Sequence, residues 1–400
     1  MKGASRNGND RAAHLDLRRS PPRAVLGIEA ELILIIDDVR RRPERIFATP
    51  RKLIRQRMIP RPGRSFQLPS GGAIYFDTGV IEVATPIIEL GPGCAYRATR
   101  LLWEQIRYVR RELDAWSRKN KCHARLQGFS THYNFSFPSA RKSNRRTCAK
   151  FAHLLAHLLP MPVALLAANR RSSAIGVRPR GSRFEVTADF TPDAALMLAT
   201  CGFIAGVVEG ALVWETYAVK EIDDHNLPRP APFRLRKHSS RRGWRALASS
   251  LQHNLFTADP NTLIWKLRDG RTESLRAISA ETLQPFRREI RQLSDAPTLK
   301  HIESVFAGDA RSFLDFPERP KSYDDVGDAI DWNRRRMRHW PRSRYEKVIH
   351  RVIAREPIRI DGKRYRVQRM QGWYEIVFQE MKTGARRIFN LDELVRLTRK

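Results

Sequence analysis

The chain has 400 residues, with 74 lysines and arginines against 42 aspartates and glutamates, and its formal net charge is +32. This length is enough for two or three domains with a sizeable core. The charge predicts affinity for an acidic partner, such as a nucleic acid, an anionic membrane surface, an acidic protein or a phosphorylated ligand. The alternative is a solvated arginine-rich surface with no such partner.

Cysteine usage and hydropathy predict a cytoplasmic protein. The four cysteines are widely spaced and include no CxxC pair, which argues against a zinc cluster or a disulfide framework and indicates a reducing compartment. No apolar run is long enough to span a bilayer, and no signal-peptide hydrophobic region follows the N-terminus. The longest apolar stretch, Ala194–Trp214, predicts a buried helix.

Three parts follow one another along the chain. Residues 1–23 are polar and arginine-rich, which predicts a disordered basic arm. Residues 24–340 form the main domain. Residues 341–400, which we call the C-terminal module, alternate around Asp361-Gly362 and Thr383-Gly384 and predict a small β-rich unit.

The main domain predicts strands that alternate with helices. Between them, an Arg- and Pro-rich segment at 228–245 predicts a loop. The strands are expected at Ala24–Ile36, Ala73–Asp77, Val80–Ala84, Leu126–Phe137 and Gly181–Phe190, and the helices at Ala95–Arg118, Thr147–Leu159 and Asp193–Tyr217.

Two of these strands form a predicted hairpin around Thr78-Gly79. A two-residue turn sets Asp77 opposite Val80 and Tyr75 opposite Glu82. Because side chains alternate across a strand, both carboxylates then share one face while the other face is apolar. This is either a solvated outer face or part of a site.

The same pattern recurs in three more strands. Glu29 and Glu31 share one face of the first strand; further polar residues on one face are His132, Asn134 and Ser136 in the next, and Arg183, Glu185, Thr187 and Asp189 in the last. A carboxylate in an apolar strand is costly unless it is paired or binds a metal.

Several carboxylates with one imidazole suit Mg²⁺ or Mn²⁺ better than Zn²⁺. Such ions commonly also bind nucleotide phosphates, and Arg178, Arg180 and Arg183 could neutralise those phosphates. Each element alone is weak: an E-x-E is common, a single strand histidine is usually a satisfied core residue, and Arg183 with Glu185 could be a plain ion pair.

The order of the motifs resembles a known superfamily. G-x-E-x-E at Gly27–Glu31, D-x-x-x-x-E-x-x-T-P at Asp77–Pro86, H-x-N at His132–Asn134 and R-x-E at Arg183–Glu185 resemble the carboxylate–amine ligases, which include glutamine synthetase and glutamate–cysteine ligase. HYNFS at 132–136 is most similar to glutamate–cysteine ligase. The hairpin and DWNRRRM at 331–337 are similar to the Pup ligase and Pup deamidase branch.

The resemblance implies an α+β fold: a curved antiparallel sheet of glutamine-synthetase type with helices on its convex face, here followed by the C-terminal module. It implies an ATP- and Mg²⁺-dependent ligase that forms an amide through an acyl phosphate. The implied metal ligands are Glu29, Glu31, Glu82, His132 and Glu185; the implied nucleotide- and phosphate-binding residues are Arg178, Arg180, Arg183, Asn134 and Ser136; the implied catalytic residues are Asp77, as a base, and Arg183.

Asn134 stands where glutamine synthetase has a histidine ligand, and Ile81 stands where the Pup branch has a histidine. Several functions remain open on the sequence. The substrate is a small amino acid or other carboxylate, or an acidic Pup-like protein tail. The Pup branch can also run as an amidase with Asp77 as nucleophile. A different class is a nucleic-acid-binding protein on a ligase scaffold, which would not need the acidic and imidazole residues to converge.

Overall fold

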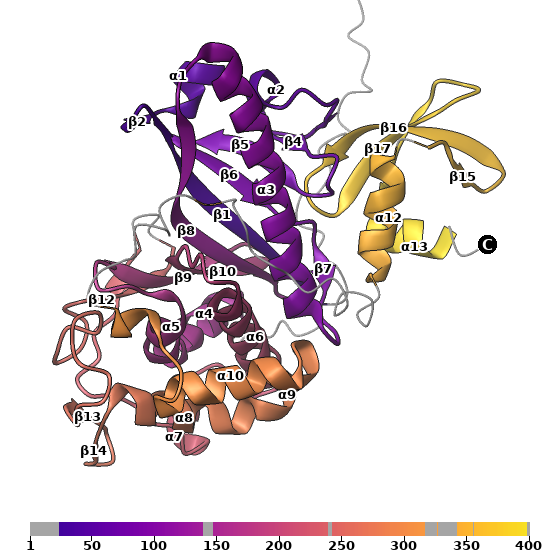
Figure 1. The fold of residues 1–400 in the computed structure, drawn as a ribbon. Helices are drawn as coiled ribbons and strands as arrows, with labels where there is room; N and C mark the ends of the chain where they lie inside the picture. Colours follow the sequence, from indigo (N-terminus) through magenta and orange to yellow (C-terminus); the bar gives the residue numbers. More distant parts are fainter. Residues whose placement is uncertain are drawn as a thin grey trace, which may run out of the picture.

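The computed structural model describes residues 24–138, 147–238, 242–316, 326, 342–354 and 356–397. These residues form a large antiparallel sheet with helices packed against one of its faces, and a smaller sheet in the C-terminal module (Figure 1). The predicted α+β fold is therefore confirmed. The basic arm at 1–23 and the segment at 331–337 lie outside the described residues.

The large sheet has 12 strands, and β1 and β8 at its centre are the longest. In order across the sheet the strands are β11 (Arg236–Lys237), β12 (Trp244–Leu247), β9 (Ala174–Arg180), β10 (Arg183–Asp189), β8 (Ala124–Ser136), β1 (Val25–Ile36), β6 (Val80–Ala84), β5 (Ala73–Asp77), β4 (Phe66–Gln67) and β3 (Ile59–Pro60), while β2 (Val39–Arg41) and β7 (Ile88–Glu89) pair with β1.

The hairpin β5–β6 has the predicted register. Tyr75 lies opposite Glu82, and Asp77 lies opposite Val80. Both turn residues have positive φ, 46° at Thr78 and 93° at Gly79, as a two-residue turn between twisted strands requires. The hairpin therefore presents Glu82 on the same sheet face as the polar residues of β1, and Asp77 at its exposed end.

The opposite face of the sheet is apolar and is covered by helices. Its central residues, among them Ile28, Tyr133 and Val186, are at most 1% exposed. They pack against α3 (Cys94–Asn120), α4 (Cys148–Leu158), α5 (Pro160–Ala167) and α6 (Ala194–Ala211). Two short helices, α1 (Pro43–Phe47) and α2 (Pro50–Leu53), follow β2.

Helix α6 is the predicted buried helix. It is long and apolar enough to cross a membrane by length and composition, as is the bent pair α4 and α5 if taken as one span, but 78% of α6 lies inside the molecule. Against it pack helices from later in the chain (Figure 1). The remaining elements of the main domain are α7 (Glu221–Asp224), β13 (Trp265–Lys266), β14 (Thr272–Glu273), α8 (Leu275–Leu283), α9 (Arg287–Leu293) and α10 (Ala296–Ala307).

The segment at 228–245 is more ordered than the predicted loop. Its end forms β11 and β12, which extend the large sheet beyond β9. The prolines and arginines of this segment hide the two strands from sequence analysis, because only short stretches of it alternate between apolar and polar residues. Strands at the edge of a sheet also tolerate long polar side chains. As a result Arg245 lies opposite Gly176 and joins the polar face of the sheet.

The C-terminal module has its own core and a four-stranded sheet. Its elements are α12 (Arg344–Ile353), β15 (Ile358–Ile360), β16 (Lys363–Gln371), β17 (Glu375–Glu380), β18 (Arg386–Asn390) and α13 (Leu391–Leu397). A buried ion pair of 3.0 Å between Arg97 Nε and Glu346 Oε2 joins α12 to α3, and Arg344 pairs with Glu89 of β7. The module is thus fixed to the main domain at the end of β1.

A polarised sheet face as candidate active site

Four predicted metal ligands lie together on the polar face of the sheet. Register places Glu31 opposite Glu82 and Glu29 opposite His132, across the neighbouring strands β6, β1 and β8. We call these four residues the acidic group. Glu29, Glu82 and His132 are each less than 10% exposed, so the group is largely removed from water.

Short distances connect the acidic group. His132 Nδ1 lies 3.5 Å from Glu29 Oε2, and His132 Nε2 lies 3.6 Å from Glu31 Oε1. Ser130 Oγ donates a hydrogen bond of 2.6 Å to Glu31 Oε2. One imidazole therefore bridges the two carboxylates of β1, and Ser130 orients the second carboxylate.

The surroundings shift the pKa values of Glu82 and Glu29 in opposite directions. Burial, together with the charges of Glu29 and Glu31, raises the pKa of Glu82 to about 10. Burial alone would also raise the pKa of Glu29, but hydrogen bonding to His132 and its charge outweigh burial and lower it. At neutral pH Glu82 therefore holds a proton, which reduces the repulsion between its carboxylate and those of Glu29 and Glu31. A bound cation would reduce the same repulsion.

The acidic group fits a divalent cation in donor type. Carboxylate oxygens are the ligands that Mg²⁺ and Mn²⁺ prefer, and three of them with one imidazole are present on one buried face. Within the described parts of the chain, no three His, Cys, Asp or Glu side chains are already arranged around one ion position. Side-chain rotation is therefore needed to complete a ligand shell.

Arginines occupy the neighbouring half of the same face. Arg178, Arg183 and Arg245 extend from β9, β10 and β12, and Arg180 follows at the end of β9. We call these four residues the arginine group. Burial lowers the pKa of Arg178 to about 10, and burial also lowers the pKa of Arg183, whose charge is supported by Glu29. A pKa near 10 still leaves Arg178 charged at neutral pH.

Glu185 belongs to the arginine group rather than to the acidic group. Its carboxylate pairs with Arg178, and Arg180 Nε donates to its Oε1 at 3.2 Å. At 1% exposure it is the most buried of the predicted ligands. Both arginines contact Oε1 of Glu185, and neither ion pair connects Glu185 to the acidic group, so its placement differs from its predicted role as a metal ligand.

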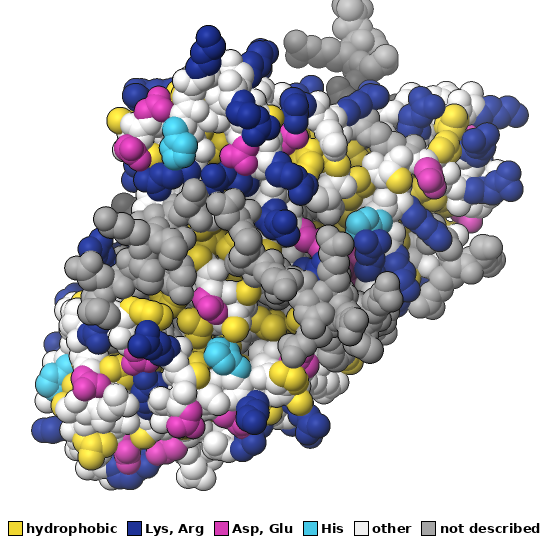
Figure 2. Space-filling view, in the orientation of Figure 1, with side chains coloured by type: hydrophobic (Ala, Val, Ile, Leu, Met, Phe, Trp, Pro, Cys, Tyr) yellow, Lys and Arg dark blue, Asp and Glu magenta, His cyan; other side chains and the backbone are white. Residues whose placement is uncertain are grey.

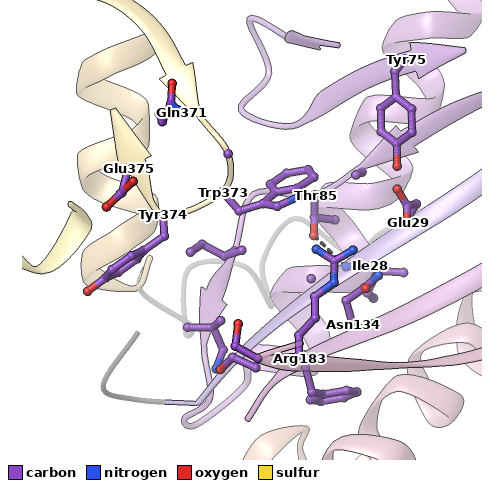
Figure 3. Close-up of a pocket in the computed structure, with 18 residues that line it drawn as sticks. Ile28, Glu29, Tyr75, Thr85, Asn134, Arg183, Gln371, Trp373, Tyr374 and Glu375 are labelled. Atoms are coloured by element: carbon purple, nitrogen blue, oxygen red, sulfur yellow. Dashed lines mark hydrogen bonds between the residues drawn. The ribbon is translucent and has the colours of Figure 1, made fainter. Parts of the chain in front are cut away.

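A cavity of about 310 Å³ opens where the two halves meet the C-terminal module. Figure 3 shows Trp373 extending from the module toward the sheet, near the guanidinium group of Arg183. Glu29, Tyr75 and Asn134 line the sheet side. Two buried polar atoms on this side, Asn134 Oδ1 and Arg183 Nε, have no hydrogen-bond partner among the described residues.

The remaining predicted residues are placed as follows. Ser136 lines the cavity, and its Oγ accepts a hydrogen bond of 2.9 Å from the backbone of Val25. Asp77 is exposed at the end of β5. Arg178 and Arg180 do not line the cavity, so among the predicted phosphate-binding arginines Arg183 alone does.

The sequence did not reveal the module's part in the site. Trp373 and Tyr374 lie in the turn between β16 and β17, after Gly372 with φ of 80°, and both line the cavity. Arg61 Cζ lies 4.0 Å from the centre of the Trp373 ring, and its NH1 donates to Gln67 Oε1 at 2.7 Å. The sequence signal that could have indicated this role is the pair of adjacent aromatic residues, Trp373 and Tyr374, directly after the turn glycine Gly372.

Of the comparisons with known proteins, the one with solved structures gave matches. No protein-family model and no curated protein matches the sequence. Among solved structures, the chain is similar to the ligase PafA in the crystal structure of its complex with the prokaryotic ubiquitin-like protein Pup. The two share 13% sequence identity and a TM-score of 0.53, over 94% of this chain and 91% of that one.

The chain has the fold of a Pup ligase. This is the fold that the resemblance implied, so the predicted fold is confirmed. The match covers 94% of the chain, and the part left out is shorter than the C-terminal module. At least part of the module is therefore matched as well. The resemblance rested mainly on motifs in residues 26–214, was thin beyond residue 221 apart from the segment at 331–337, and did not cover the module, which carries none of its motifs.

Proposed function

We propose that the chain is an ATP- and Mg²⁺-dependent ligase that joins a carboxylate to an amine through an acyl phosphate. The observation that supports this most directly is the division of one buried sheet face into the acidic group and the arginine group, beside a cavity. In a nucleotide–metal complex the negative phosphates lie next to the positive metal ions. The arginine group is complementary to the phosphates, and the acidic group is complementary to the cations.

In this proposal Glu29, Glu31, Glu82 and His132 hold the cations, with Mn²⁺ as a possible substitute for Mg²⁺. When bound, divalent ions neutralise charge on the transferring phosphoryl group. Arg183 contacts the phosphates from the other side, because it lines the cavity and its Nε is buried without a partner within the described chain. Glu185 positions Arg178 and Arg180 instead of binding metal.

The cavity receives the nucleobase and ribose. Its volume lies at the lower end of the range for ligand pockets, which suits part of a nucleotide rather than the whole. Trp373 offers a ring for stacking, and Asn134 Oδ1 offers a hydrogen-bond acceptor. The hydroxyl of Ser136 remains able to donate, since the Val25 amide occupies only one of its acceptor positions.

Asp77 acts as the base that accepts a proton from the incoming amine. It lies at the exposed end of the hairpin, on the same face as Glu82 but further from the centre of the sheet. An amine arriving from a second molecule can reach this position, whereas the buried acidic group is accessible only to small ligands. Proton removal is needed for amide formation and not for phosphorylation of the carboxylate.

The carboxylate substrate is an acidic protein tail rather than a free amino acid. The structural neighbour is a ligase in complex with Pup, a protein. The net charge of +32 favours an acidic macromolecule, because electrostatic attraction of that strength is not needed for a small substrate. In this proposal the reaction takes place in the cytoplasm, where ATP is available.

Turnover with a panel of substrates tests the proposal. The protein is incubated with ATP, Mg²⁺ and either single amino acids or acidic peptides, with hydroxylamine in place of the amine. We expect ADP release that requires both Mg²⁺ and a carboxylate, and a hydroxamate product that reports the acyl phosphate. A correctly folded protein that binds no ATP in a calorimetric titration would refute the ligase proposal, and turnover with amino acids alone would refute the protein substrate.

A further inference from the structure

The outward face of the C-terminal sheet carries a cluster of arginines. Residues such as Tyr365, Phe378 and Phe389 point toward α12 and α13 and form the module's core. Because strands alternate, their neighbours point away from that core. The exposed arginines on this outward side, which we call the arginine face, are Arg359, Arg364, Arg366, Arg369 and Arg386.

One carboxylate, Glu375 at the cavity end of β17, shares the outward side of the sheet with these arginines. Within the described chain, no ion pair joins any of the five arginines to a carboxylate. Arg359 and Arg364 even lie directly opposite each other on β15 and β16. Like charges in this position destabilise a sheet, so the arrangement costs folding free energy unless an anion binds there.

The face offers charge and hydrogen bonds but few apolar anchors. Its glutamine side chains include Gln368 and Gln379, which bond to each other at 2.8 Å. Val377 and Ile388 are its apolar residues, and Val377 is only 6% exposed. None of the described residues that point outward from these strands is aromatic. Figure 2 shows lysine and arginine side chains gathered over the module at the right of the view.

We propose that the arginine face binds the sugar–phosphate backbone of a nucleic acid. Protein partners gain most of their binding energy from aromatic and aliphatic anchors in desolvated pockets, whereas the apolar residues of this face are limited to Val377 and Ile388. A nucleic acid backbone instead gains nearly all of its sequence-independent affinity from phosphate contacts and released counterions. A guanidinium group can donate two parallel hydrogen bonds to two oxygens of one phosphate, and a lysine ammonium cannot. A phosphate-binding surface therefore favours arginine over lysine.

The spacing of the arginines suits a repeating anion. Arg364 and Arg366 are two residues apart on β16, which places their side chains on one face at about 7 Å along the strand. A β-bulge after Val367 brings Arg369 onto the same face. The resulting row runs along β16 and ends at Arg369, two residues before Gln371, which lines the cavity. With no group reading base edges, binding is expected to be independent of sequence.

Fluorescence anisotropy with a labelled DNA duplex tests this proposal and does not depend on the ligase reaction. Binding is measured over a range of salt concentrations for the full chain and for the triple variant Arg364→Gln, Arg366→Gln, Arg369→Gln. The matched control, Arg40→Gln, Arg41→Gln, Arg45→Gln, removes the same charge from exposed arginines of β2 and α1. Thermal melting is expected to show both variants folded, since all six positions are exposed.

The module variant should bind DNA more weakly and reduce the slope of log affinity against log salt by about two to three, one phosphate contact for each arginine. The control should keep nearly the full slope. Equal losses in the two variants would overturn the proposal, because general surface charge would then explain the binding. It would also be overturned if the module variant lost binding to a polyglutamate peptide while its affinity for DNA was unchanged.

Discussion

The two halves of the large sheet's polar face are built alike and differ in charge. Strands β6, β1 and β8 present Glu82, Glu31, Glu29 and His132, while β10, β9 and β12 present arginines on the same face. Both halves have the same apolar core behind them. The backbone therefore does not determine the charge; the residues at alternate strand positions do.

The difference between the halves extends to how each half is neutralised. The arginine half contains its own counter-charge, because Glu185 pairs with Arg178 and Arg180. The acidic half has His132, and otherwise a proton on Glu82. A bound cation would therefore change the acidic half more than a bound anion would change the arginine half. Each prediction below probes one side of this contrast.

The largest effect is expected from Glu31→Gln. The substitution keeps the shape of the side chain and removes a charge from the acidic group, so Mg²⁺-dependent ATP binding should be lost and turnover should fall by about 10³-fold or more. Calorimetric titration with Mg²⁺ and ATP measures the loss. The fold should stay intact or become more stable, because one of three neighbouring like charges is removed.

Glu104→Gln is the matched control for this change. Glu104 lies on α3, is 44% exposed and forms an ion pair with Arg100, away from the sheet's polar face. It should leave nucleotide binding unchanged. Equal affinity for Mg²⁺-ATP in the wild type and Glu31→Gln would exclude Glu31 from a cation site.

Asp77→Asn should separate the two steps of the proposed reaction. The variant should bind Mg²⁺-ATP normally and release phosphate slowly by hydrolysis of the acyl phosphate, while amide formation falls by about 10²-fold, the lower end for a lost general base. We expect the lower end because Asp77 is exposed and water can replace part of its role. Amide formation at the wild-type rate would contradict the base role, and loss of Mg²⁺-ATP binding would make Asp77 a ligand.

Glu82 should make metal-free stability depend on pH. Its folded-state pKa of about 10 lies above the ordinary value near 4.3, so the folded protein holds a proton that the unfolded chain releases. The stabilisation is complete below about pH 4 and is lost as pH rises toward 10. Melting temperatures in a chelator should therefore fall with pH, by about 2–4 °C for each kcal/mol lost.

Two comparisons sharpen this result. Glu82→Gln cannot titrate, so its melting temperature should depend less on pH over the same range. Added Mg²⁺ should reduce the pH dependence of the wild type as well, because a cation replaces the proton among the carboxylates. A wild type and Glu82→Gln with identical pH profiles would mean that Glu82 is ionised in the folded protein.

Alternation was enough to predict the face on which each residue of the acidic group lies, and the resemblance implied that these residues form one site. Glu29, Glu31, Glu82 and His132 lie in strands whose other faces are continuously apolar, so face assignment follows from the period of two. The role of Glu185 was harder to predict. The alternation of side chains places Glu185 on the correct face of its strand, but it does not show which neighbouring strand supplies its ion-pair partners. Arg178 and Arg180 come from β9, which forms a hairpin with β10 through the two residues Gly181 and Ser182, and the predicted strand began only at Gly181.

The contribution of the C-terminal module could not be obtained from local pattern. Trp373 is distant in sequence from Arg61, Tyr75 and Arg183, and only the docking of the module through Arg97–Glu346 and Arg344–Glu89 brings it to the sheet. Long-range contacts of this kind leave no periodic signal.

The smallest effect is expected from Trp373→Ala, which tests whether the module completes the nucleotide site. Its ring lines the cavity and contacts the Arg61 guanidinium at 4.0 Å. Aromatic stacking contributes about 0.5–1.5 kcal/mol, so the Kd for ATP should rise by about 2- to 10-fold while the acidic group is unaffected. Trp373→Phe keeps a ring and should restore most of the affinity. Unchanged ATP affinity in Trp373→Ala would place the nucleobase outside this cavity, and an equal loss in Trp373→Phe would indicate that the substitution disturbs the docking of the module instead of removing a stacking surface.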